Sequence, residues 1–197
     1  MQYLERALNA TTFKDGQLAE MDDALAGTQG RLDLAGAMVT ERCIMLEYCR
    51  NPSLTGAGGA WALSLPGIQG RGMADILDYG DKYVRAAGLP STERLARFRE
   101  IGQELDQLSF MHIVIKTLAP ALRRVAELDL RCHAHLDLAR AALAAERYRL
   151  ATGEVPERLS QLVPDYLAEV PIDPFDGQPI RYRRTDPGYL LYSVLED

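Results

Sequence analysis

The sequence lacks the runs and the charge excess that mark membrane proteins, secreted precursors and nucleic-acid binders. No stretch approaches the roughly 18 consecutive apolar residues of a membrane-spanning helix. The first residues show no basic region followed by an apolar segment, the pattern of a signal peptide. With 22 basic against 28 acidic residues, the net charge of −6 provides no basic excess for nucleic acid or an anionic membrane. We therefore expect neither a membrane segment nor a nucleic-acid partner.

Motifs of catalysis and metal binding are missing as well. There is no GxSxG, HExxH or SxxK spacing, and the three cysteines form no CxxC pair. Cys43 and Cys49 lie too far apart on one expected helix to bridge, although either could pair with Cys132, and we favour buried free thiols. A catalytic dyad of Cys43 or Cys49 with His112 or His133 stays open, since such partners are adjacent only in the folded chain. We expect no cofactor and favour a non-enzymatic role.

Helical periodicity dominates the sequence up to about residue 150. Apolar residues at helical spacing predict helices over 17–26, 32–49, 73–87 and 91–108, with Asp15 capping the first and Ser91 the last. Pro120 is expected to begin or kink a longer helix. The apolar seam of that helix is expected at positions 118, 122, 125, 129, 132, 136, 139, 143, 146 and 150. Such a seam needs helical partners, so the pattern predicts a helical bundle.

A glycine-rich loop over 51–72 interrupts the helices and contains the only tryptophan, Trp61. A loop of this length in a compact domain is functional or mobile. Its glycines match neither GxGxxG nor a phosphate-binding loop with lysine, which argues against a nucleotide site. We favour a loop that inserts Trp61 into the core, and retain Trp61 as a candidate binding residue of a lid over a pocket.

After the long helix the pattern changes to turns and strands. Strong helix formers run up to Thr152, and Gly153 follows where a left-handed C-terminal cap is expected. A short broken helix over 159–167 and a Pro-rich corner over 170–177 come next. Residues 180–184 and 189–194 alternate or are rich in strand formers, so they predict an antiparallel hairpin that packs on the long helix. The fold class is α+β, mostly α-helical.

This order of parts resembles the globular end of the major pseudopilins of type II secretion systems. The resemblance covers about residues 139–194. The matching segments are 145–153, Val155-Pro156, 159–164, Tyr166-Leu167, Val170-Pro171, 173–177 and 189–193. It implies an assembly role in the cell envelope. The upstream helical region is not recognised.

The chain departs from that family at both ends. Family members have a leader, a methylated N-terminal residue, a hydrophobic helix that anchors and polymerises, and an acidic, glycine-rich calcium loop after the last strands. None of these is visible between Met1 and Asp197. Fibre formation and calcium binding are therefore not carried over. We expect either a cytoplasmic relative or a periplasmic, extracytoplasmic fragment of an anchored protein.

Two groups of charged residues are candidate sites. Asp129, His133 and Asp137 share a helix face at i, i+4 spacing, which suits a divalent metal or a proton relay, although surface ion pairing is the commoner use of such a face. Arg181 and Arg183 share one face of the first strand. They are candidates to bind an acidic partner, and a solvated face is the simpler alternative.

These patterns predict a helical region over 1–118 and a long helix with the hairpin module over 119–197, together forming one compact unit. We expect a non-enzymatic, envelope-associated interaction or assembly domain that binds a protein partner or itself. The alternative is a small-molecule-binding protein or enzyme, with a pocket in the helical region covered by the loop around Trp61.

Overall fold

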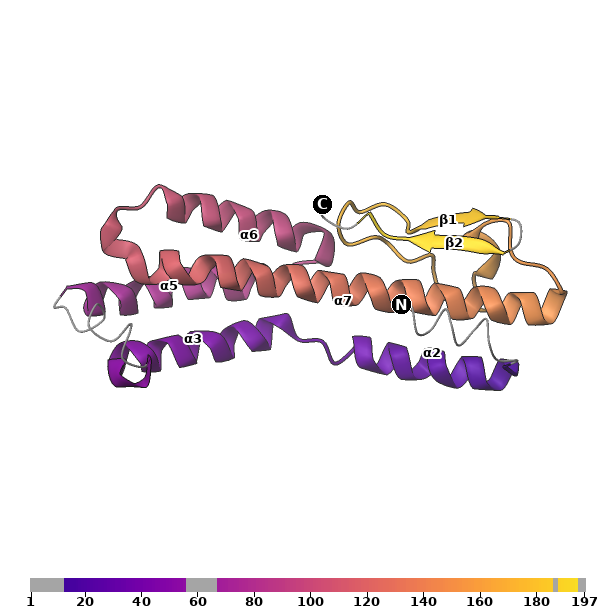
Figure 1. Ribbon diagram of the computed structural model, residues 1–197, viewed down its shortest axis with the longest axis horizontal. Helices are drawn as coiled ribbons and strands as arrows, with labels where there is room; N and C mark the ends of the chain where they lie inside the picture. Colours follow the sequence, from indigo (N-terminus) through magenta and orange to yellow (C-terminus); the bar gives the residue numbers. More distant parts are fainter. Residues whose placement is uncertain (1–12, 56–66, 186–187, 195–197) are drawn as a thin grey trace. The chain divides into compact units, whose positions relative to one another are not determined.

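The computed structural model describes residues 13–55, 67–185 and 188–194. Among them, helices precede a single C-terminal hairpin (Figure 1). The elements in chain order are α2 (Asp15–Gln29), α3 (Leu34–Arg50), the 3₁₀ helix η1 (Pro52–Thr55), α5 (Ile68–Ala87), α6 (Ser91–Asp106), the 3₁₀ helix η2 (Phe110–His112), α7 (Ile113–Thr152), the 3₁₀ helix η3 (Leu159–Leu162), β1 (Arg181–Arg184) and β2 (Tyr189–Tyr192). The fold is therefore mostly α-helical with a small antiparallel sheet, as the sequence predicts.

The chain divides into two compact units. One is Asp33–Asp129, and the other combines Met1–Leu32 with Leu130–Asp197. The boundary falls inside α7, so this helix contributes its first turns to one unit and its remaining turns to the other. The division expected from the sequence, 1–118 and 119–197 forming one compact unit, stays a prediction.

The unit Asp33–Asp129 is helical and has its own core. α3 packs against α5, and α5 packs against α6. Phe98 and Ile101 of α6 are fully buried, and Phe98 meets Tyr83 of α5 with ring centroids 5.1 Å apart. The first turns of α7 complete this core with Ile115, Ala119, Leu122 and Ala126.

The second unit packs the C-terminal segment onto the end of α7. Its core joins Leu138, Ala141 and Ala145 of α7 with Leu162 of η3 and Ile180 before β1. Figure 1 shows the hairpin lying along the C-terminal part of α7, within this unit. The expected packing of hairpin on helix is therefore confirmed.

The C-terminal end of α7 follows the local chemistry. The helix ends at Thr152, and Gly153 has a φ of +82°, in the left-handed region that a side chain disfavours. The amide of Gly153 donates to the carbonyl of Arg149 at 2.8 Å, which satisfies one free carbonyl of the last turn. The cap expected from the sequence is confirmed.

The buried stripe of α7 differs from the expected seam. Val125, Cys132 and Leu150 belong to the expected seam but are exposed. Leu122, Ala139 and Leu143 of the expected seam are buried, and so are positions 115, 119, 126, 130, 134, 138, 141, 144 and 145. Many of the buried residues are alanines, because small side chains allow close approach of neighbouring elements. Apolar size alone therefore identified only part of the buried stripe.

Two helix starts also differ from expectation. Asp15 is the first residue of α2, not its cap, and its carboxylate pairs with Arg147 at 2.7 Å. α7 begins at Ile113, and Pro120 lies inside it. Proline has no N–H, so the carbonyl of Lys116, four residues earlier, loses its usual helical donor.

Two glycines give opposite predictions for stability. Replacing Gly153 by alanine should lower the free energy of unfolding by about 1 kcal/mol, since L-residues are strained at positive φ. A Cβ there would meet nothing within 4 Å, so the cost lies in the backbone alone. Gly27 lies in α2 with equally open surroundings, and Gly27→Ala should raise stability by up to about 1 kcal/mol. Urea denaturation of both variants measures the difference, and the same sign for both would contradict the explanation.

Candidate functional site

The hairpin has two different faces, set by the register of its strands. Arg181 pairs with Tyr192 and Arg183 with Leu190, so these four side chains share one face. We call this set, Arg181, Arg183, Leu190 and Tyr192, the outer face. The alternate positions, Tyr182, Tyr189 and Leu191, pack against the core of the unit.

The inner face is fixed to α7 by tyrosine hydroxyls. Tyr189 donates to the carbonyl of Ala142 at 3.2 Å or to Glu146 Oε1 at 3.1 Å, and Tyr182 donates to the carbonyl of Pro156. The two rings stack with centroids 5.7 Å apart. Burial, followed by the nearby Glu146 carboxylate, raises the pKa of Tyr189 well above its usual value, so the hydroxyl remains a donor. These bonds hold the outer face in a defined position on its unit.

Asp173 holds the corner before the hairpin. Its side chain is fully buried, and its two oxygens accept from the amides of Phe175 at 3.0 Å and of Val194 at 2.8 Å. The guanidinium of Arg181 lies 3.6 Å away. One carboxylate therefore ties the corner to the segment after β2, which confirms a fixed corner and gives it a physical cause.

The two sequence candidates on the outer face have different environments. Arg181 donates to Asp176, with Nη1 3.1 Å from Oδ1, and this hydrogen bond is the main reason that the pKa of Asp176 is lowered. Its charge is thus largely balanced by Asp176 and Asp173. Arg183 is exposed to solvent. It is the more accessible of the two cations on the outer face.

The sequence analysis missed the apolar half of the outer face. Leu190 and Tyr192 are 43% and 46% exposed, although both are large apolar residues in a strand. The alternating burial of β2 places them outward while Tyr189 and Leu191 face the core. Their exposure could have been expected from strand pairing, because residues that pair directly with Arg181 and Arg183 lie on the same face of the hairpin. Arginine and tyrosine are enriched at protein contact surfaces.

The candidate metal residues are engaged in other contacts. Asp129 pairs with Arg94, whose side chain is only 14% exposed, and Asp137 accepts from the Gln29 amide at 3.0 Å. Burial is the main reason that the pKa of Asp137 is raised, which opposes the anion that a metal needs. Within residues 13–55, 67–185 and 188–194, no group of three or more side chains of His, Cys, Asp or Glu could hold a metal, so His133 joins no such group there.

Trp61, the remaining sequence candidate, lies outside the described residues, as do all of residues 56–66 of its loop. The expected loop bounds of 51–72 are too wide, since η1 covers Pro52–Thr55 and α5 begins at Ile68. The three cysteines are free, which agrees with expectation, but only Cys49 is buried. Cys43 and Cys132 are exposed, so the prediction of buried thiols is wrong for these two. Burial raises the pKa of Cys49, so this thiol is a poor nucleophile.

His112 belongs to a cluster in the unit Asp33–Asp129. Its Nδ1 lies 2.9 Å from Asp75 Oδ2, and Asp75 is almost fully buried. Arg71 places Nη2 at 3.3 Å from His112 Nε2 and Nε at 3.3 Å from Asp75 Oδ1. Arg71 Nε also lies 3.4 Å from His112 Nδ1, so this nitrogen has both the guanidinium and the Asp75 carboxylate as neighbours. Both ring nitrogens are therefore occupied, and the cluster joins α5 to η2 instead of presenting a free base.

No helix among the described segments is both long and apolar enough to cross a membrane. No family model, no curated protein and no solved structure matches the chain. The resemblance of residues 139–194 to the major pseudopilins therefore stays an expectation from the sequence, and the outer face stands on its own geometry.

Proposed function

We propose that this protein is a non-enzymatic interaction or assembly domain whose partner docks on the outer face of the hairpin. The observation that carries the proposal is the exposure of Leu190 and Tyr192 beside Arg183, on a hairpin that Tyr189 holds to α7 and whose other face packs on the core of its unit. Tyrosine and arginine are enriched among residues that dominate binding energy. A rigid support lowers the entropy cost of ordering such a surface on binding.

The chemistry of the outer face defines the partner. Its two arginines, one of them balanced by Asp176, favour a surface that combines acidic and apolar side chains. The chain itself has a net charge of −6, so a second copy can supply acidic groups. We therefore infer self-association through this face. The location in the cell envelope rests on the pseudopilin resemblance of residues 139–194 alone.

A leucine pair tests this proposal with matched chemistry. Leu190 on the outer face and Leu150 near the end of α7 belong to the same unit and are 43% and 42% exposed. Leu190→Ser should weaken self-association at least about tenfold, because it removes an apolar contact from a small interface. Leu150→Ser should leave it unchanged. Sedimentation velocity over a wide concentration range, at low and high salt, measures both.

Two results would count against the proposal. Equal sedimentation of wild type and both variants as monomers at every concentration would exclude self-association. A photo-crosslinking side chain at position 190 would then test for a different protein in cells. If that crosslink persists in Arg183→Glu, or also forms from position 150, the outer face is not a specific contact surface.

A further inference from the structure

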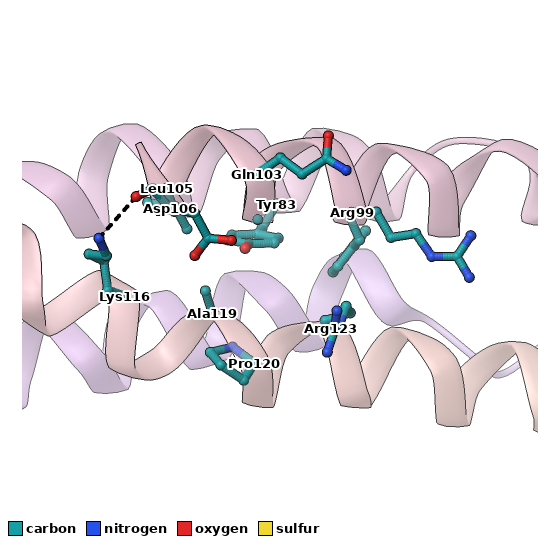
Figure 2. Close-up of a pocket in the computed structure, with 11 residues that line it drawn as sticks. Tyr83, Arg99, Gln103, Leu105, Asp106, Lys116, Ala119, Pro120 and Arg123 are labelled. Carbon is teal, nitrogen blue, oxygen red and sulfur yellow. Dashed lines mark hydrogen bonds between the residues drawn. The ribbon is translucent and has the colours of Figure 1, made fainter. Parts of the chain in front are cut away.

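The unit Asp33–Asp129 contains a cavity that has no residue in common with the outer face. It has a volume of about 330 Å³ and is lined by side chains from α5, α6 and α7. Figure 2 shows α6 on one side of it and α7 on the other. Polar and apolar groups share its lining. Phe98 and Leu105 lie behind the wall at 0% and 1% exposure, whereas Ala119 and Pro120 of α7 are more accessible. A cavity of this volume is within the range of small-molecule sites.

The hydroxyl of Tyr83 points to a ligand. Tyr83 lines the cavity and is 1% exposed, and its hydroxyl oxygen has no hydrogen-bond partner within the described part of the chain. Buried hydroxyls are nearly always paired, because an unpaired one loses its hydration without compensation. Burial, the largest cause, raises the pKa of Tyr83 to about 12, so the group is a protonated donor at neutral pH. A ligand in the cavity that carries an acceptor oxygen would pair this hydroxyl.

The wall of the cavity has an excess of positive charge. Arg99, Lys116 and Arg123 line it, against a single carboxylate, Asp106. The ammonium of Lys116 donates to the carbonyl of Leu108 at 2.9 Å and to that of Asp106 at 3.3 Å, a bond drawn in Figure 2. These bonds hold the ammonium at the end of α6 and leave its charge beside the cavity.

Arg123 and Asp106 both act on Tyr83. Arg123 lies close enough to lower the pKa of the Tyr83 hydroxyl, and Asp106 close enough to raise it. Arg123 makes only a long contact, 3.6 Å, to Glu127 on its own helix, and its side chain is 52% exposed. Figure 2 shows Asp106 extending from α6 toward Tyr83. A donor, a cation and an acceptor therefore surround one small space.

The proline of α7 adds another acceptor. Pro120 and Lys116 both line the cavity, and the carbonyl of Lys116 lacks its usual helical donor because Pro120 has no N–H. A ligand hydroxyl or N–H can supply that hydrogen. The site thus combines groups for an anion with groups for a donor.

We propose that this cavity binds a small organic carboxylate with an aromatic or apolar body and a hydroxyl group. The carboxylate pairs with Arg123 and accepts from Tyr83, the body packs against Ala119 and Pro120, and the hydroxyl meets Asp106 or the carbonyl of Lys116. A volume of about 330 Å³ equals roughly eleven water molecules in the liquid, so the ligand has about ten non-hydrogen atoms. This site is independent of the outer face and adds a binding activity to the proposed function.

The test uses 4-hydroxybenzoate as the probe, with 4-hydroxybenzamide as its uncharged analogue and inorganic phosphate as a simple anion. Isothermal titration of the full chain should give saturable binding of the acid and at least about tenfold weaker binding of the amide, since a bond to a charged group is the stronger kind. Arg123→Gln should weaken the binding of 4-hydroxybenzoate about tenfold. Arg124→Gln is the matched control, because Arg124 contacts the same Glu127 but does not line the cavity.

Tyr83→Phe provides a second readout that a purely structural role does not give. It should raise the melting temperature of the ligand-free protein by a few degrees, because a buried unpaired hydroxyl is removed. The same substitution should weaken the binding of 4-hydroxybenzoate by about tenfold. No saturable binding, equal effects of Arg123→Gln and Arg124→Gln, or phosphate binding as tight as the acid would each overturn the proposal. A Tyr83→Phe variant that binds the acid unchanged would overturn the role of the hydroxyl and with it the site.

Discussion

Phe98→Ala should lower the free energy of unfolding of the unit Asp33–Asp129 by about 3–5 kcal/mol. The side chain is 0% exposed and packs against the Tyr83 ring at a tilt of 55°, at the junction of α5 and α6. Its loss removes apolar burial and leaves a cavity that helices held by other contacts cannot close fully. Urea denaturation followed by helical circular dichroism measures the change, with an unchanged slope expected.

Phe110 is the matched control for that substitution. It is a phenylalanine of the same unit, but its side chain is 75% exposed at the start of η2. Phe110→Ala should change stability by no more than about 0.5 kcal/mol. Similar losses for the two variants would mean that the core around Phe98 and Tyr83 is not the main source of stability in this unit.

Asp173→Ala should destabilise the C-terminal unit by about 2–4 kcal/mol, because two backbone amides lose their acceptor in a dry environment. These amides belong to Phe175 and Val194, on opposite sides of the hairpin, and Asp173 is 0% exposed. The loss should appear as faster hydrogen exchange at residues 173–194, since the corner and the end of the hairpin separate.

Asp173→Asn separates the shape of that side chain from its acceptor capacity. An amide keeps one acceptor oxygen, so one of the two N–H groups stays paired and the loss should be smaller than for alanine. The exposed Asp165 of the same unit is the control, and Asp165→Ala should leave the urea midpoint unchanged. Equal shifts of the urea midpoint for Asp165→Ala and Asp173→Ala would contradict the proposed role of Asp173 in joining the corner to the segment after β2.

Local patterns predicted the elements well and the burial less well. Caps, X-Pro steps and alternation act between neighbours in the chain. They predicted the C-terminal ends of α3 and α7, the corner and the hairpin. The expected stripe of α7 was only partly right, because Ala126, Ala134, Ala141 and Ala145 are also buried while larger apolar residues such as Leu150 are exposed. A hydrophobicity pattern ranks residues by size, whereas close packing between elements selects small ones.

The candidate site was likewise predictable from the sequence only in part. Arg181 and Arg183 were identifiable from strand alternation, and Leu190 and Tyr192 would have followed from pairing the two strands. The ion pair of Asp129 with Arg94 was not predictable, because its partners lie 35 residues apart in sequence.

The sequence by itself determined that this protein is mostly helical, that α7 stops at Gly153 and that two short strands close the chain, since each depends on residues a few positions apart. Tertiary structure alone decided that Asp173 accepts a hydrogen bond from the amide of Val194, 21 residues away. It also decided that the hydroxyl of Tyr83 is buried beside Arg123. The physical reason is that burial and pairing depend on which distant segments exclude water from a group. No local pattern encodes that exclusion.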